Sequence, residues 1–438
     1  MVRENIRSWG LPGPFQHQTI DLALQNPDWR DATTTVLPFG NGRSYGDSCI
    51  NDGRCLLLAR GLDRYRAFDP QTGVLVCDAG VMLSDIVRDF MPRGWFPPVT
   101  PGTRFVTLGG AIANDIHGKN HHVAGTIGSH IESLVLERSD GSAITCSSRE
   151  NAHLFRGTIG GLGLTGLITA ATLRLRRVET GWMRVHQQRF ESLDEFFSIN
   201  EWAESRYEYA VSWIDCATGA GKVRRGVYLA ADHATLDEIG PRDKIPPAGR
   251  TTAVPLTPPF SLVHPLSVRG MNELYWRRAS AKREFLQPVL PYFYPLDGIL
   301  RWNRIYGPLG FYQYQCVLVH DAPAALAEML AVIVRSRQAS FLAVLKQFGA
   351  TPPAGLLSFP RSGITLSLDF PNRGKATHEL FKALDEIVLG AGGALYPAKD
   401  ARMSTTMFEA GYPCAAEFLR WKDPRFSSNF WRRVTGTE

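Results

Sequence analysis

The first 180 residues alternate short apolar runs with glycine-rich stretches, a pattern typical of short strands joined by tight loops. Apolar runs bounded by turn residues at 55–59 and 74–79 predict two of these strands. Residues 81–94 predict a short helix, with Ser84 as its N-cap and Gly94 just past its end. The dipeptide Asp140-Gly141 lies between two apolar runs and predicts a β-hairpin.

The pattern changes between residues 182 and 395. Strand-like apolar runs lie at 209–215, 226–231, 311–319, 341–348 and 364–370, and helical periodicity lies at 324–337 and 377–389. This order of elements predicts an α+β layer, in which an antiparallel sheet carries helices on one face. Seven prolines between 241 and 265 exclude a central strand or a helix there and predict a long exposed loop.

Composition narrows the class of protein. The chain has 438 residues, of which 44% are hydrophobic and 21% charged, so it is globular and long enough for two domains. Its net charge of +6 is spread over that length and does not indicate a nucleic-acid partner. Seven cysteines, never spaced C-x-x-C, fit neither a disulfide framework nor a zinc finger. The chain starts without an apolar stretch and has no long apolar run. We therefore expect a cytoplasmic or peripheral membrane protein without signal peptide or transmembrane helix.

Two glycine-rich segments are candidates for phosphate binding. GLGLTG at 161–166 matches G-x-G-x-x-G, but the residues before it resemble the end of a helix and those after it alternate like a strand. A dinucleotide fingerprint needs the opposite order, so a Rossmann site is excluded. GNGRSYGD at 40–47 lies between two strand-like runs, and its backbone N–H groups suit an anion-binding nest. An ordinary tight connection explains this second loop equally well.

The segment at 101–122, PGTRFVTLGGAIANDIHGKNHH, carries the third candidate. Thr107 before Gly109 and Gly110 suits a helix N-terminus pressed against a phosphate. The histidines that follow suggest a metal, but no cysteine or carboxylate pattern completes a ligand set, and Lys119 among them would repel a cation. We therefore expect no metal, and a histidine–lysine pair that faces an anionic substrate.

Together these motifs resemble the flavin domain of the vanillyl-alcohol-oxidase superfamily, in which two small α+β subdomains hold FAD without a Rossmann fold. DIHGKNHH, GFYQYQCV at 310–317, LKQFG at 345–349 and YPAKDAR at 396–402 are more specifically similar to the decaprenylphosphoryl-β-D-ribose 2-oxidases, FAD subunits of a two-protein epimerase. The resemblance implies an α+β fold with a two-lobed FAD-binding domain at 1–180. It also implies a substrate domain with an antiparallel sheet at 181–395 and a C-terminal segment, 396–438, that returns to the FAD domain.

The resemblance also implies which residues surround the flavin. They are Gly40, Asn41, Gly42, Arg43, Ser44, Tyr45, Gly46, Asp47, Gly102, Thr103, Thr107, Leu108, Gly109, Gly110, Asn114, Asp115, Ile116, His117, Ile168 and Tyr396. Many members of the superfamily link FAD covalently to a histidine in the first glycine loop. Here that loop has no histidine, so we expect non-covalent FAD.

At the substrate face the resemblance implies four catalytic residues, Lys399, Lys346, His117 and Tyr45, and five substrate-binding residues, Gln313, Gln315, Trp213, Lys119 and Ser367. Alcohol oxidation needs a base near the hydroxyl and positive charge near the developing alkoxide, and lysine and histidine supply both. Gln313 and Gln315 alternate along a strand, so both amides point to one face and suit sugar hydroxyls. Ser367 stands where actinobacterial members carry a cysteine that is not needed for hydride transfer. Taken alone, each lysine suits a solvated surface and Trp213 suits the core.

The reaction implied is FAD-dependent oxidation of the 2-hydroxyl of a polyprenylphosphoryl-β-D-ribofuranose to the 2-keto sugar. The implied partners are an NAD(P)H-dependent short-chain reductase, which completes epimerisation, and a membrane surface. Basic residues around the proline-rich loop (Arg242, Lys244, Arg250) favour this lipid phosphate over a soluble alditol or aldonolactone. A non-catalytic flavin-binding partner in glycolipid assembly is the third alternative, which the lysines and glutamines argue against. We also predict that 241–265 is a mobile lid over a channel near a membrane; the alternative is a packed loop.

Overall fold

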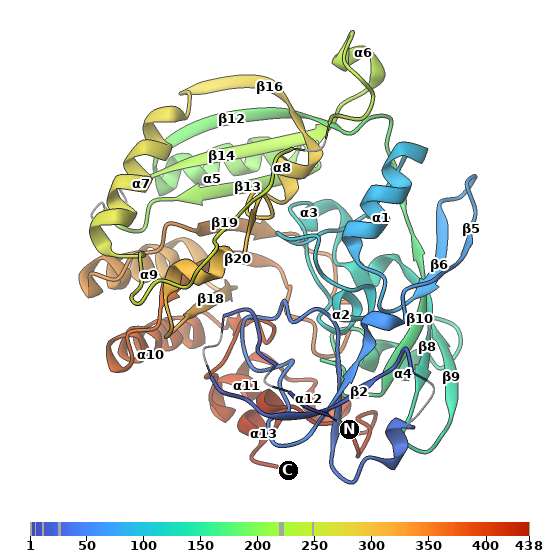
Figure 1. The fold of residues 1–438 in the computed structure, drawn as a ribbon. Helices are drawn as coiled ribbons and strands as arrows, with labels where there is room; N and C mark the ends of the chain where they lie inside the picture. The colour runs from blue at the N-terminus through green and yellow to red at the C-terminus, as the bar shows by residue number, and fades with distance from the viewer. Residues whose placement is uncertain are drawn as a thin grey trace.

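The computed structural model describes residues 2–4, 6–10, 13–24, 28–218, 223–247 and 249–437. Two small sheets of four and five strands, and a two-stranded pair of β7 (Trp95–Phe96) with β11 (Arg176–Arg177), come from the first 180 residues (Figure 1). The four-stranded sheet has the order β1 (Val2–Glu4), β2 (His17–Asp21), β4 (Cys55–Leu58) and β3 (Val36–Phe39). Its strands β2, β4 and β3 pair in parallel, and β1 pairs antiparallel to β2.

The second sheet is antiparallel throughout. Its order is β5 (Tyr65–Phe68), β6 (Val74–Asp78), β10 (Leu167–Arg174), β8 (Ile131–Glu137) and β9 (Ala143–Ser147). Helices α1 (Leu83–Phe90), α2 (Leu108–Ala113) and α4 (Ala152–Thr158) share one apolar core with this sheet. The apolar side chains of α1 therefore face the sheet, as an amphipathic surface helix requires.

Most expectations for this part of the chain are confirmed. The runs at 55–59 and 74–79 form β4 and β6, and Asp140-Gly141 turns the β8–β9 hairpin with Gly141 at a φ of +88°. The stretch at 161–166 connects a helix to a strand, which confirms that it is no dinucleotide fingerprint. The predicted N-cap Ser84 is wrong. Helix α1 begins at Leu83, and its N-cap is Met82. The N–H of Met82 donates a hydrogen bond to the Asp85 carboxylate and so fixes the start of the helix.

The second half of the chain builds an eight-stranded antiparallel sheet (Figure 1). Its order is β16 (Lys282–Pro288), β12 (Trp182–Ser192), β14 (Val223–His233), β13 (Tyr209–Ile214), β19 (Ala343–Phe348), β20 (Gly363–Pro371), β18 (Phe311–Leu318) and β21 (Ala394–Leu395). Helices α5 (Leu193–Glu204), α9 (Ala322–Ser336) and α10 (Lys375–Gly390) share a core with one face. The predicted layer of antiparallel strands and helices is confirmed, as are its five strands and two helices; β12, β16 and α5 were not predicted.

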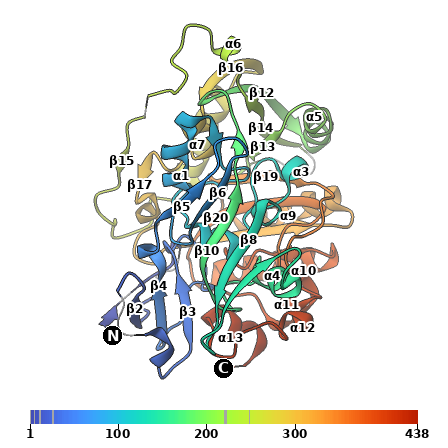
Figure 2. The same ribbon diagram turned by 90° about the vertical axis from the view of Figure 1, so that its right-hand side faces the viewer.

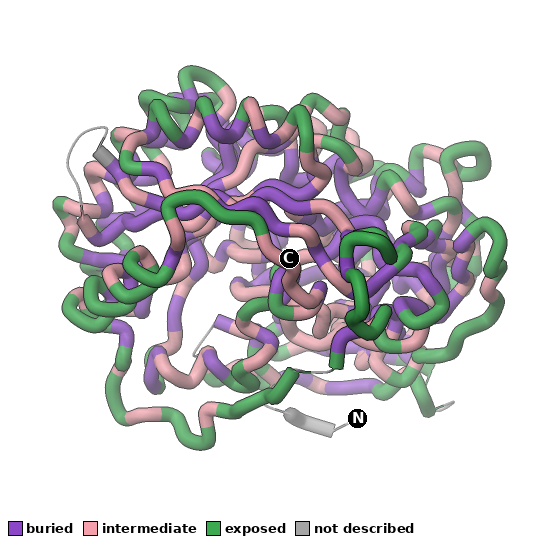
Figure 3. The backbone as a smooth tube through the Cα atoms, turned by 90° about the horizontal axis from the view of Figure 1, so that it is seen from above, coloured by how far each residue is buried: buried purple, intermediate pink, exposed green. Residues whose placement is uncertain are grey.

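Side-chain alternation gives this sheet two different faces. On β18, Tyr314 and Cys316 belong to the core beneath the helices, whereas Gln313 and Gln315 project from the opposite face. On β19, Leu345 belongs to the same core and its neighbour Lys346 does not. Figure 3 shows the interior of the molecule as largely buried and many connecting loops as exposed. The face of the sheet opposite α5, α9 and α10 therefore carries polar and charged side chains into the interior.

The proline-rich stretch is an exposed loop over most of its described length. Its short strand β15 (Thr252–Ala253) pairs in parallel with β17 (Ile299–Leu300), and Leu256 is 77% exposed. Two details differ from the prediction. Val263 is buried, and Pro265 is the first residue of helix α7 (Pro265–Arg278), where a missing N–H costs no helical hydrogen bond. The mobility of this loop stays a prediction.

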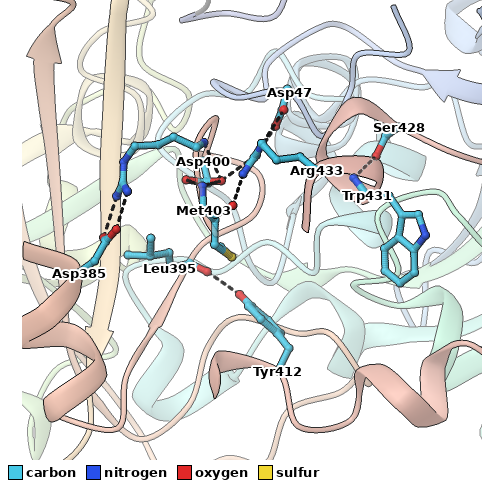
Figure 4. Close-up of polar contacts among 10 residues, drawn as sticks. Asp47, Asp385, Leu395, Asp400, Met403, Tyr412, Ser428, Trp431 and Arg433 are labelled. Carbon is cyan, nitrogen blue, oxygen red and sulfur yellow. Dashed lines mark hydrogen bonds and ion pairs between the residues drawn. The ribbon is translucent and has the colours of Figure 1, made fainter. Parts of the chain in front are cut away.

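The C-terminal residues lie against the N-terminal strands. Helices α11 (Thr405–Gly411), α12 (Ala415–Phe418) and α13 (Asn429–Thr435) follow the large sheet, and the N–H of Val36 in β3 donates to the carbonyl of Arg425 at 2.8 Å. Arg433 of α13 bonds both Asp47 (2.7 Å) and Asp400 (2.9 Å), as Figure 4 shows. Within the described residues, no helix combines the length and apolar character needed to cross a bilayer.

Candidate active site

A cavity of about 920 Å³ lies between the glycine-rich loops and the face of the large sheet opposite α5, α9 and α10. One part of its lining comes from the loop at 40–45 and from the segment at 100–110. The other part comes from β13, β18, β19 and β20, with residues of α7 and β17. The cavity thus has backbone-rich loops on one side and side-chain-rich strands on the other.

The first glycine loop is joined by backbone atoms to the segment that carries Lys399. The N–H of Tyr45 donates to the carbonyl of Ala398 at 2.8 Å. A Cβ on Gly46 would lie 1.4 Å from the carbonyl oxygen of Asp400, so only glycine fits there. This packing brings the Nζ of Lys399 within 3.7 Å of the Tyr45 ring centroid.

The second glycine segment packs directly on the first. Thr107 is the N-cap of α2, and its hydroxyl oxygen accepts from the N–H of Gly110 at 3.2 Å. A Cβ on Gly40 would lie 2.4 Å from that same oxygen, and the Asn41 amide donates to the carbonyl of Phe105 at 2.8 Å. The two loops therefore form one continuous wall of backbone groups.

This wall fits a flavin dinucleotide. Gly102 lines the cavity, and a Cβ built on it meets no atom within 4 Å, so the backbone there is open to a ligand. Five lining residues bury a polar atom that has no partner among the described residues, and three of them lie in the glycine-rich first part of the chain: Arg43 Nε, Ser48 Oγ and Asn114 Oδ1. Unpaired buried donors and acceptors of this kind are costly unless a ligand satisfies them.

Sixteen of the twenty expected flavin-site residues line the cavity. They are Gly40, Asn41, Gly42, Arg43, Ser44, Tyr45, Gly102, Thr103, Thr107, Gly109, Gly110, Asn114, Ile116, His117, Ile168 and Tyr396. The remaining four lie outside the lining and hold the loops in place. Gly46 packs on Asp400, Asp47 pairs with Arg433, and Leu108 is in the apolar core. Asp115 accepts from the N–H of Gly128 and the hydroxyl of Ser358.

All nine residues expected at the substrate face line the cavity, namely Tyr45, His117, Lys119, Trp213, Gln313, Gln315, Lys346, Ser367 and Lys399. Two of them are fixed by backbone carbonyls. The Trp213 indole N–H donates to Phe341 at 3.0 Å, and the Lys119 ammonium donates to Tyr292. Burial lowers the pKa of Lys119 to about 7, and the nearby charge of Lys346 contributes.

His117 lies between Lys346 and Gln315. Its Nδ1 is 3.1 Å from the Lys346 Nζ, and its Nε2 is 3.0 Å from the Gln315 side-chain amide. Burial, followed by the charge of Lys346, lowers the pKa of His117 well below its ordinary value, so the ring is neutral. A neutral imidazole has one nitrogen that donates a hydrogen bond and one that accepts. The protonation state of Lys346 therefore determines whether Nδ1 donates or accepts.

Two protonation patterns satisfy this group. The Gln315 amide nitrogen is the atom that faces His117 Nε2. When Lys346 is an ammonium, it donates to Nδ1, and the Gln315 amide has to turn its oxygen toward the ring to accept from Nε2–H. When Lys346 is a neutral amine, it accepts from Nδ1–H, and the Gln315 N–H donates to Nε2. Burial and the charge of Lys399 lower the pKa of Lys346 to about 7, so both patterns are populated near neutral pH. His117 therefore transmits the state of Lys346 to Gln315.

Lys399 is different because its Nζ has no hydrogen-bond partner among the described residues; its contact is the face of the Tyr45 ring. The carboxylate of Asp369 on β20 supplies the nearby negative charge. Burial lowers the pKa of Lys399, and Asp369 opposes that shift. Burial likewise raises the pKa of Asp369, whose Oδ1 accepts from the Gln313 amide at 2.5 Å and whose Oδ2 is unpaired.

The Tyr45 phenol stays protonated in this surrounding. Burial, supported by the negative charge of Asp369, raises its pKa well above the ordinary value. Tyr45 can therefore donate a hydrogen bond or pack its ring against Lys399, but it cannot accept a proton as a base near neutral pH.

Sequence reasoning missed several residues of the site. Asp369 lies two positions after Ser367, so the period of a strand would have placed both on one face. Tyr275 of α7 lines the cavity and packs edge-on against Trp213, with ring centroids 4.9 Å apart. Asp297 also lines the cavity and accepts from the N–H of Arg104. Tyr275 and Asp297 come from segments in which no local sequence pattern indicates a position at the cavity.

Comparison with known proteins agrees with this geometry. The FAD binding domain family matches residues 28–147. Decaprenylphosphoryl-β-D-ribose oxidase of Mycolicibacterium smegmatis is 35% identical over 410 residues, 91% of this chain and 89% of that protein. An uncharacterized protein of Streptomyces coelicolor is 33% identical over 374 residues, 81% of this chain and 100% of that protein. L-gulonolactone oxidase of Mus musculus is 25% identical over 179 residues, 40% of each chain.

The breadth of these matches decides the family. The gulonolactone oxidase shares less than half of this chain, whereas the match to the ribose oxidase runs over nearly the whole of both proteins. FAD is the cofactor, as the matching domain family and the cavity wall agree. The chain belongs to the family of the decaprenylphosphoryl-β-D-ribose oxidases and is an FAD-dependent oxidoreductase.

Proposed function

We propose that the protein oxidises the 2-hydroxyl of a polyprenylphosphoryl-β-D-ribofuranose to the 2-keto sugar, and that Lys399 removes the hydroxyl proton. The observation that carries this proposal is a half-buried lysine amine that faces the cavity without a hydrogen-bond partner among the described residues. Its lowered pKa supports a neutral amine near physiological pH, which a general base needs. The family of the chain supports the substrate class.

Bound FAD supplies the two-electron oxidation, and the chain's own residues supply position and charge. The amides of Gln313 and Gln315 bind hydroxyls of the sugar from the floor of the cavity. Lys346 and Lys119 place positive charge beside the reacting oxygen and the anionic part of the substrate. His117 holds Lys346 and Gln315 in register, and the aromatic residues Tyr45 and Trp213 keep water from the reacting centre.

We also propose a separate role for each part of the chain. The two small sheets within 1–180 are the two lobes that hold FAD, 181–395 receives the sugar, and 396–438 returns to complete the flavin site. An NAD(P)H-dependent short-chain reductase takes the 2-keto product and reduces it from the opposite face. Contact with a membrane gives access to the polyprenyl-linked substrate.

Anaerobic flavin bleaching tests the reaction. Purified protein should be yellow, release its FAD on acid precipitation, and lose its flavin absorbance on mixing with farnesylphosphoryl-β-D-ribofuranose. The 2-keto product should be trapped with hydroxylamine and identified by mass. L-Gulonolactone serves as the comparison substrate. Faster bleaching by the lactone than by the phosphoryl ribose would overturn the proposed substrate, and flavin that stays with the precipitate would overturn non-covalent binding.

A further inference from the structure

Large apolar side chains are concentrated on one part of the surface. Among the described residues, sixteen large hydrophobic residues are exposed, and ten of them lie between 256 and 309. We call these ten the apolar rim: Leu256, Phe260, Leu262, Leu266, Met271, Leu274, Tyr275, Ile299, Leu300 and Leu309. Single exposed apolar residues are ordinary, but a contiguous group on a protein surface marks an interaction site.

Hydrogen bonds join the segments that carry the rim into one surface. Strand β15 pairs with β17, and the N–H of Leu262 donates to the carbonyl of Ile305 at 2.8 Å. The hydroxyl of Ser267, in α7, donates to the carbonyl of Leu262 at 2.9 Å. Figure 2 shows the chain between α6 (Leu236–Ile239) and β15 on the outer edge of the molecule, with β17 beside it.

The rim is continuous with the cavity. Met271, Tyr275, Ile299 and Leu300 line the cavity, and they are also 56%, 44%, 43% and 41% exposed. Tyr275 packs against Trp213 at the sheet face that carries the candidate substrate residues. The cavity therefore opens to solvent between apolar side chains, which suits a substrate whose sugar is polar and whose tail is hydrocarbon.

The same segment holds most of the net positive charge of the chain. Residues 249–310 contain eight Lys or Arg and three Asp or Glu, so this segment carries +5 of the total of +6. Of the basic residues, Arg269, Arg277, Arg278 and Arg301 are exposed beside the rim. Of the acidic residues, Glu273 is bonded to two arginines and Asp297 is buried. Apolar and basic groups side by side match the chemistry of an anionic bilayer surface.

We propose that the apolar rim docks on the surface of an anionic lipid bilayer, with its apolar side chains among the acyl chains and its arginines at the headgroups. The inference deepens the proposed function, because a rim seated on lipid lets a polyprenyl-linked sugar enter the cavity without crossing water. A second copy of the chain is a poorer occupant, since two surfaces of charge +5 repel each other.

Vesicle binding tests the rim directly. The FAD-loaded protein is mixed with vesicles of phosphatidylcholine alone or with 30% phosphatidylglycerol, about the composition at which basic surfaces respond to charge. We expect co-sedimentation with the anionic vesicles, weaker at high salt. The triple variant Leu256→Asp, Phe260→Asp, Leu266→Asp should lose about tenfold or more in partitioning. These three residues do not line the cavity.

The matched control changes exposed leucines elsewhere, Leu24→Asp, Leu236→Asp and Leu419→Asp, which are 63%, 51% and 57% exposed. It should bind vesicles as the unchanged protein does, and both variants should keep their flavin absorbance. Holoenzyme that does not sediment with anionic vesicles would overturn the proposal, as would an equal loss in the control. A dimer in light scattering that dissociates only in the rim variant would assign the rim to a second copy instead.

Activity separates docking from the proposed reaction. With soluble farnesylphosphoryl ribose, the rim variant should match the unchanged protein. With long-chain substrate embedded in vesicles, its kcat/KM should fall about tenfold, in proportion to its lost binding. If no prenylphosphoryl ribose bleaches the flavin while vesicle binding persists, the proposed function fails and the docking surface stands. If the rim variant acts on embedded substrate at the full rate, the docking role fails and the proposed function stands.

Discussion

The glycine loops line the cavity and the apolar rim surrounds its opening, but the two regions are held in contrasting ways. The loops are closely packed: Gly40 lies against the Thr107 side chain and Gly46 against the Asp400 backbone, and neither position has space for an added methyl group. The segments of the rim are held by a small apolar cluster and a few hydrogen bonds, and the rim side chains themselves remain exposed to solvent. Gly270, in the rim helix α7, has no neighbour within 4 Å of an added Cβ.

This difference separates two requirements of one reaction. A cofactor that stays bound through many turnovers needs a wall of fixed donors, which close backbone packing provides. A lipid-linked substrate that enters and leaves each turnover needs an opening that is apolar and sparsely packed. The cavity meets both needs because the two linings come from different parts of the chain.

The same substitution in the two regions should have opposite effects. Gly46→Ala forces a Cβ against the Asp400 carbonyl and should cost about 3 kcal/mol or more, with loss of FAD. Gly270→Ala meets no atom and should stabilise the helix by about 0.5–1 kcal/mol. Thermal unfolding and the ratio of flavin to protein absorbance measure both. Equal effects of the two variants would remove the contrast.

Lys399→Ala should reduce turnover about 10²- to 10⁴-fold while FAD stays bound, because the proton acceptor is lost and the glycine loops are unchanged. Lys375→Ala, at a lysine on α10 whose side chain is 90% exposed, is the matched control and should keep full activity. Stopped-flow reduction of the flavin gives the rate. A loss of only a few-fold for Lys399→Ala would assign this lysine a structural role.

Asp369→Asn should shift the pH dependence. The carboxylate raises the pKa of Lys399 against the effect of burial, so its removal lowers that pKa further. Because the base is the neutral amine, the acidic limb of kcat/KM should move to lower pH by about one unit or more. The other titratable groups near Lys399 are Lys346 on β19 and His117, whose ring is neutral, and the substitution leaves both unchanged. An unmoved limb, or one that moves to higher pH, would contradict this assignment.

Ser367→Cys should have the smallest effect. Ser367 lines the cavity on β20 but makes no side-chain contact on which the proposed proton transfer depends. A thiol is close in size to a hydroxyl, so we expect kcat/KM within about threefold of the unchanged protein. Steady-state rates and the pH profile check this result. A tenfold loss would show that Ser367 binds the sugar directly.

Local pattern was sufficient for strands that are buried along most of their length. The runs at 311–319 and 364–370 are recognisable because β18 and β20 bury nearly every side chain and are therefore largely apolar. Helix α5 was missed although its start is encoded locally, since the Ser192 hydroxyl oxygen accepts from the N–H of Glu195. Strands β12 and β16 are long and partly polar, and their pairing is set by neighbours distant in sequence.

The site residues that lie within a sequence motif were predictable. The glycine loops and Lys399 lie in such motifs, and they line the cavity. Tyr275 and Asp297 were not predictable, because α7 and the segment before β17 reach the cavity only through tertiary packing. Asp47 and Asp115 show the reverse: each lies inside a motif but bonds protein groups instead of lining the cavity.

Arg433 links the assembly of the flavin site to the order in which the chain is synthesised. This side chain in α13 bonds Asp47, which ends the first glycine loop, and Asp400, which follows Lys399 (Figure 4). During translation the glycine loops leave the ribosome long before Arg433 does. Until then, Asp47 and Asp400 lack the arginine side chain that links them. Tight flavin loading should therefore wait until residue 433 has been synthesised, and a ribosome stalled before that residue should carry a nascent chain without FAD.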